Sequence, residues 1–122
     1  MATTFSKVLL SGSTNGKAVK VAATATAGTT IHATGTSATI LDEIWIYAVN
    51  SSTSSVKLTI EWGEATAPDG NIEVTVLPEA GLVTIIPGLV LSGTGSAATT
   101  VKAFAGTTNV IMLSGYVNRI TA

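Results

Sequence analysis

The sequence predicts an all-β protein: a two-sheet antiparallel β-sandwich of about eight strands, with the jelly roll as one arrangement of it. Threonine occurs 21 times among the 122 residues. Its β-branched side chain favours strands, as do those of Val and Ile. Clusters of Gly and Ser punctuate the chain about every ten residues, a spacing typical of a sandwich or barrel. No segment has the pattern of an amphipathic helix.

Alternation of apolar and polar residues is clearest over 56–62. Val56, Leu58 and Ile60 share one face there, and Lys57 and Glu61 share the other. The segments 41–50 and 109–120 are instead apolar on both faces, which is typical of strands that are covered on both sides. The strands that we expect are 6–11, 17–23, 41–50, 56–62, 72–76, 82–86 (resuming at 89–91 after a proline kink), 101–105 and 109–120.

Short polar links predict how two pairs of these strands connect. The five-residue link 51–55 predicts an antiparallel hairpin of 41–50 with 56–62, and the Gly-Thr-Thr link at 106–108 predicts a second one. Gly115 in the last strand predicts a bulge. Trp62 is expected to be largely buried, because it continues the apolar face of its strand.

The stretch 22–39 consists almost entirely of Ala, Thr, Gly and Ser. Such residues bury little surface, so we expect a long mobile loop, or an arm that a neighbouring subunit orders. The length of the chain suits one domain spanning 1–122. No run approaches the ~20 apolar residues of a membrane helix, and the first residues lack the apolar core of a signal peptide.

Charged residues make up 11% of the chain, with a formal net charge of −1, against about 25% in typical soluble proteins. No basic stripe is present, which disfavours nucleic-acid binding. The absence of cysteine excludes disulfides and thiolate metal sites. A surface with so few charges favours association with other subunits, although a Thr- and Ser-coated soluble domain explains the composition too.

Few residues suggest chemistry, and we expect no enzyme, no cofactor and no metal. His32 is the only histidine, and we expect a loop histidine with no catalytic role. Asp42 and Glu43 are adjacent in a strand, so they point to opposite faces and cannot flank one bond. These carboxylates and Glu61 are expected to be solvated. A Pro-Asp-Gly turn explains residues 68–70 without a metal.

Six segments resemble a group of small virion proteins of tailed bacteriophages. They are KVLLSGS (7–13), TTIH (29–32), DEIWIYA (42–48), KLTIEWG (57–63), VKAFA (101–105) and GYVNRI (115–120). The resemblance implies a capsid decoration (cement) protein, which binds the outer shell and stabilises the joints between capsomers. It implies the major capsid protein as partner, a homo-oligomer (trimer favoured, dimer possible), and a virion assembled in the bacterial host cytoplasm.

Large amphipathic aromatic residues dominate protein interfaces, and residues that gain order from a partner lie close to it. Two rival functions remain open. One is a tail or head-fibre structural module, and the other is a carbohydrate-binding β-sandwich domain with an exposed aromatic row on one sheet. The candidate interface residues are Trp45, Tyr47, Tyr116, Ile31 and His32.

Overall fold

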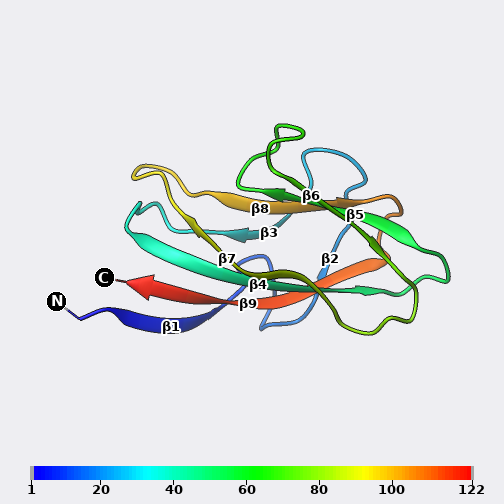
Figure 1. Cartoon of the computed structure of the whole chain (residues 1–122), viewed down its shortest axis with the longest axis horizontal. Coiled ribbons are helices and arrows are strands. Elements are labelled where there is room, and N and C mark those ends of the chain that lie inside the picture. The colour runs from blue at the N-terminus through cyan, green and yellow to red at the C-terminus, as the bar shows by residue number, and fades with distance from the viewer. Residues whose placement is uncertain (1, 122) are drawn as a thin grey trace.

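The computed structural model describes residues 2–121, which form two packed antiparallel sheets (Figure 1). The strands are β1 (Thr4–Leu9), β2 (Val19–Lys20), β3 (Thr29–Ala33), β4 (Ile40–Asn50), β5 (Val56–Trp62), β6 (Asn71–Val76), β7 (Val83–Ser92), β8 (Thr100–Ala105) and β9 (Ile111–Thr121). The five-stranded sheet has the order β1-β9-β4-β7, with β2 also paired to β9, and the four-stranded sheet has the order β3-β8-β5-β6. The all-β two-sheet sandwich is therefore confirmed. The jelly roll stays a prediction.

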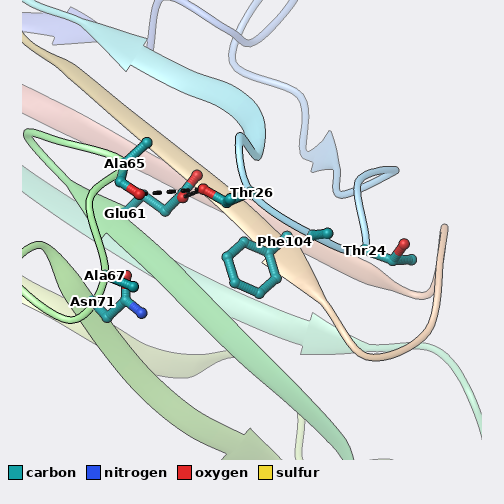
Figure 2. A pocket seen from close by; sticks show the side chains of 8 residues that line it. Thr24, Thr26, Glu61, Ala65, Ala67, Asn71 and Phe104 are labelled. Carbon is teal, nitrogen blue, oxygen red and sulfur yellow. Dashed lines mark hydrogen bonds between the residues drawn. The ribbon is translucent and has the colours of Figure 1, made fainter.

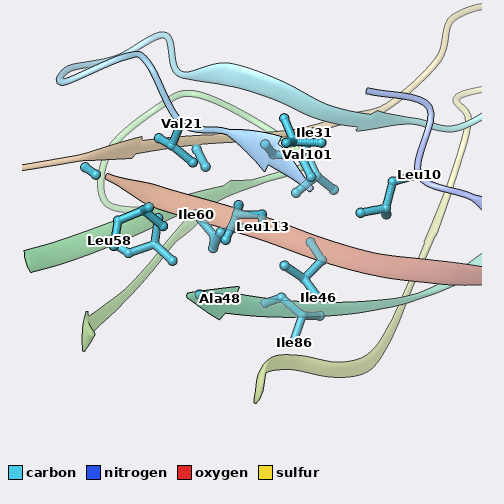
Figure 3. Close-up of a cluster of buried hydrophobic side chains, with 14 of the residues drawn as sticks. Leu10, Val21, Ile31, Ile46, Ala48, Leu58, Ile60, Ile86, Val101 and Leu113 are labelled. Carbon is cyan, nitrogen blue, oxygen red and sulfur yellow. The ribbon is translucent and has the colours of Figure 1, made fainter. Parts of the chain in front are cut away.

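The core lies between the sheets and follows the alternation in the strands (Figure 3). From β4, the side chains of Ile44, Ile46 and Ala48 are fully buried, and Leu58 and Ile60 of β5 meet them from the other sheet. Burying a side chain of this size contributes about 1.5–3 kcal/mol, so the two facing rows account for much of the stability. Trp62 is only half-buried and packs at the margin of this core, not within it.

Both predicted hairpins are wrong, because their strands lie in different sheets. The link 51–55 carries the chain across from β4 in one sheet to β5 in the other, and β8 and β9 are divided in the same way. The Asn50 amide fastens the first crossing: it donates to the carbonyls of Ser54 and Val76, both at 2.8 Å, and its oxygen accepts from the Ser52 amide at 2.9 Å. Alternation shows only which face is apolar, so it fits a crossing and a hairpin equally well.

The expectation of a long loop or arm over 22–39 is wrong for its centre. Strand β3 lies within this stretch and pairs with β8, with a register shift between Thr30 and His32. Ile31 fills the core there. A strand is held by its backbone hydrogen bonds, so one well-placed apolar side chain suffices in a segment of otherwise small residues.

Two glycine and proline positions also differ from expectation. β7 continues as one strand through Pro87 and Gly88, since an edge strand can accommodate a residue without an N–H, but its pairing with β4 shifts register there. Gly115 pairs with Ile46 in unshifted register, so it marks no bulge. Glycine is needed because a Cβ there would lie 1.9 Å from the carbonyl oxygen of Trp45.

Candidate functional site

The outer face of the five-stranded sheet carries the most prominent apolar surface of the described residues. Side chains on β4, β9 and β1 that alternate with the core residues point to this side: Trp45 is opposite Tyr116, and Tyr116 is opposite Leu9. The face is open to solvent, with exposed fractions of 71% for Phe5 and 53% for Leu9. We call this surface the aromatic face and define it by Phe5, Leu9, Leu41, Trp45, Tyr47 and Tyr116.

A row of stacked groups lies across the strands at the centre of the aromatic face. The Trp45 and Tyr116 rings are 6.0 Å apart between centroids and inclined by 13°, a geometry in which aromatic pairs attract. The Lys7 ammonium lies 4.7 Å from the centroid of the Tyr116 ring. On the other side of the row, a Cβ at Gly88 would lie 2.8 Å from the Trp45 ring, so only glycine allows β7 to approach it.

Few charges interrupt this face. The Glu43 carboxylate accepts hydrogen bonds from the Asn118 amide at 3.0 Å and from the Trp45 indole N–H at 3.2 Å. The hydrogen bond from Asn118 and, to a lesser extent, that from Trp45 hold the pKa of Glu43 below its ordinary value. Burial raises the pKa of Tyr47, and the neighbouring Tyr116 adds to the shift. The Glu43 carboxylate thus fixes the orientation of the Trp45 indole.

Three of the five predicted interface residues lie together on the aromatic face, and two do not. Trp45, Tyr47 and Tyr116 are half-buried and share one side of one sheet. Ile31 and His32 are buried in the interior, with exposed fractions of 0% and 1%, so they are not surface residues in this fold. The prediction of an exposed loop at these two positions is wrong because β3 carries them into the space between the sheets.

His32 belongs to a buried ionic network that joins the two sheets. Its Nε2 lies 2.8 Å from Oδ2 of Asp42, which is 1% exposed. Arg119 donates two hydrogen bonds to the same carboxylate, from Nε at 2.8 Å and from Nη2 at 2.9 Å. Thus β3 in one sheet is fastened to β4 and β9 in the other. The expectation that Asp42 is solvated is wrong. The expectation that Asp42 and Glu43 point to opposite faces of the strand is confirmed, because Asp42 is buried and Glu43 is half-buried on the outer side.

The protonation of this network follows from its geometry. The Ser11 backbone N–H donates to Nδ1 of His32 at 3.0 Å, so the ring proton lies on Nε2 and is donated to Asp42. Burial raises the pKa of Asp42, but the hydrogen bonds from Arg119 and then His32 outweigh burial and leave it below the ordinary value. Both ring nitrogens are used within the fold, and neither is free to take a proton from a substrate.

A sequence signal for this network existed. Asp42 occupies the same parity as Ile44 and Ile46, and Arg119 the same parity as Val117, so both should point into the core. A charge at a core-facing position is buried, and a buried charge needs a partner of opposite sign. Glu61 is also buried, contrary to expectation, although its parity is that of the polar face.

Other site types find no support in residues 2–121. No group of three or more His, Asp or Glu side chains is placed there to hold a metal ion. A helix of the length and apolarity needed to cross a bilayer is likewise missing from that part of the chain. Comparisons of the sequence and structure with protein-family models, with curated proteins and with solved structures give no match.

Proposed function

We propose that this chain is a structural subunit of a bacteriophage virion, a decoration protein that attaches to the outer shell of a capsid through its aromatic face. The aromatic face carries this proposal, since it is an open sheet surface with Trp45 and Tyr116 already stacked at its centre. Rigid, preorganised aromatic side chains lose little conformational freedom on binding, and they dominate the energetics of protein interfaces.

Two further features support attachment to other subunits. Exposed apolar side chains surround the ring pair, with Val90 47% and Leu41 37% exposed at the β7 side. Contiguous apolar patches on one face mark interaction sites in soluble proteins. A chain with 11% charged residues also has little electrostatic repulsion to keep copies apart on a crowded shell. In this proposal the partner is the major capsid protein, and the chain binds as a homo-oligomer, with a trimer favoured over a dimer.

The test mixes the purified chain with capsids assembled without it and measures cosedimentation. Trp45→Ser combined with Tyr116→Ser should abolish binding, because these changes remove the centre of the face. A matched control is Leu77→Ser combined with Leu82→Ser, which removes two exposed apolar side chains that lie outside the aromatic face. Loss of binding in both double variants, or in neither, would contradict the proposed role of the face.

A carbohydrate-binding module is the second candidate, because Trp45, Tyr47 and Tyr116 share one face of one sheet. Sugar recognition uses the flat faces of aromatic rings. Here the Tyr116 ring already stacks against Trp45 and is contacted by Lys7, so less ring surface is free for a sugar. A glycan array with the wild-type chain decides between the two.

A third role, as a tail or head-fibre module, predicts a few to dozens of copies per particle by quantitative gel, whereas decoration predicts hundreds.

A further inference from the structure

A pocket of about 240 Å³ lies on the outer side of the four-stranded sheet, remote from the aromatic face. Its walls come from two loops, 24–26 and 65–67, and its floor from β5, β6 and β8. Figure 2 shows the Phe104 ring between Thr24 on one side and Ala67 and Asn71 on the other. The volume is below the roughly 300–1,000 Å³ of drug-sized sites, so the pocket suits a small ligand or a single side chain.

Glu61 places a carboxylate in this pocket, and its exposed fraction is only 1%. Its Oε1 accepts from the Gly28 backbone N–H at 2.6 Å, and its Oε2 accepts from the Thr26 hydroxyl. Both donors are neutral, so the carboxylate is hydrogen-bonded but has no counter-ion among them. The cross-strand neighbour Lys102 forms no ion pair with Glu61 within the described residues. A buried carboxylate is ordinarily paired with a cation.

A second polar group in the pocket, the side-chain amide of Asn71, has an oxygen without a hydrogen-bond partner among the described residues. Asn71 is the register partner of Glu61 on β6, so both side chains lie on the same side of the sheet. Its Oδ1 is buried and has no hydrogen-bond partner among residues 2–121, a condition that is rare in folded proteins. The pocket therefore combines a carboxylate, a free amide oxygen and an aromatic ring, three groups that each attract a cationic N–H donor.

We propose that this pocket binds a primary alkylammonium group, with the ammonium between Glu61 and Asn71 and the hydrocarbon stem against Phe104 and the alanines of the two loops. The chemistry is the same whether the group is a free small amine or a lysine side chain of a neighbouring protein. This proposal does not depend on the capsid role, because it concerns the opposite sheet.

The test is a titration of the full-length chain followed by ¹⁵N–¹H NMR. n-Butylammonium is the free-amine probe, and Nα-acetyl-lysine methylamide represents a protein lysine. n-Butanol and n-butyrate are the neutral and anionic controls of matched length. At least one ammonium probe should shift the amides of Gly28 and Asn71 saturably, with a dissociation constant on the order of millimolar. Saturation by n-butylammonium alone identifies a free amine, and saturation by the lysine probe alone identifies a protein side chain; saturation by both shows that the site accepts either source.

Variants tie the shifts to the pocket. Glu61→Gln should weaken binding at least about tenfold, the loss expected for one charge-assisted contact. Glu64→Gln, which alters an exposed carboxylate in the adjacent loop, should leave binding unchanged. If Glu61→Gln does not fold, Ala25→Leu decides, because Ala25 is exposed and its enlarged side chain should fill the pocket and abolish binding. Equal shifts with butanol or butyrate, no saturable shift with either ammonium, or unchanged affinity in Glu61→Gln or Ala25→Leu would overturn the proposal.

Discussion

The two outer faces of the sandwich differ in how the rest of the chain covers them. On the four-stranded sheet, the outward residue Glu61 is charged, yet it is only 1% exposed, because Thr26 and Gly28 fold over it and donate hydrogen bonds to its carboxylate. On the five-stranded sheet, the outward residues are apolar and aromatic, yet Phe5 and Leu9 are exposed. The chain therefore covers a charged residue on one outer face, whereas it leaves apolar residues of the other outer face open to solvent.

This difference between the two faces supports the proposal that a partner covers the aromatic face. Leaving apolar area in water costs about 25 cal/mol per Å², so a face of this kind gains free energy when another molecule covers it. The cover on the other sheet comes from within the chain and is held by hydrogen bonds to Glu61. Substitutions can remove the contacts on each side separately, beginning with the ionic network that joins the two sheets.

Asp42→Asn should have the largest effect and destabilise the fold by about 1.5–3 kcal/mol, since it removes the buried charge that accepts hydrogen bonds from the partly exposed Arg119. Chemical denaturation followed by tryptophan fluorescence measures this change in the free energy of unfolding. Its matched control is Glu43→Gln, the next residue along the strand but on the solvent-facing aromatic face, which should lower the unfolding midpoint much less. Equal losses in the two variants would show that the inner and outer carboxylates do not differ as described.

Thr26→Val tests the cover on the four-stranded sheet. The change keeps the shape of the side chain but removes the hydroxyl that donates to Glu61, so it should cost about 1–2 kcal/mol. Hydrogen exchange should also accelerate at the Gly28 amide, whose acceptor is the same carboxylate. Thr24→Val is the control, since it lies in the same exposed segment and in the pocket wall but does not bond to Glu61. If Thr24→Val matches Thr26→Val, the hydroxyl contact is not what holds the cover.

Gly88→Ala tests the preorganisation of the aromatic face at a cost of about 1 kcal/mol. The new methyl group would meet the Trp45 ring, and Gly88 has a φ of +88°, which only glycine adopts easily. Gly95→Ala is the control because Gly95 has a φ of +100° but open space at the Cβ position. Near-ultraviolet circular dichroism should therefore change for Gly88→Ala alone; a similar change in both variants would attribute the effect to backbone strain.

The pH dependence of stability tests the Asp42 network without a substitution in the wild-type chain. Because the folded-state pKa of Asp42 lies below its ordinary value of 3.8, its contribution to stability is fully present above that ordinary value and is lost as the pH falls through the folded pKa. Unfolding free energies measured from about pH 5 to pH 2 should fall more steeply for the wild type than for Asp42→Asn. Parallel slopes would mean that Asp42 is not stabilised by its partners.

Local patterns predicted much of this fold. The alternation in β5 identified its buried face, whereas the apolar residues on both sides of β4 predicted cover on both faces, and within the chain only the side of Ile44 and Ile46 is fully buried. The connections were wrong because a five-residue link closes a hairpin or crosses between sheets with the same residues, and only the Asn50 contacts in the folded chain distinguish them.

The candidate sites also differ in how far local sequence patterns predicted them. Trp45, Tyr47 and Tyr116 were predicted because large amphipathic aromatic residues dominate protein interfaces and are visible in the sequence. The burial of Glu61 was not predicted, since it depends on a segment more than thirty residues earlier that packs over it, as the contact between Thr26 and Glu61 shows. Long-range cover of this kind has no periodic signature in the sequence.

The most direct test of the central claim is a cryo-EM reconstruction of capsids mixed with the purified chain. We expect density for the chain on the outer shell, with the aromatic face turned toward neighbouring subunits of the shell and the 23–28 segment turned away. The joint should bury more than about 1,000 Å² in total. Density with the aromatic face open to solvent, or confined to the tail, would contradict the account.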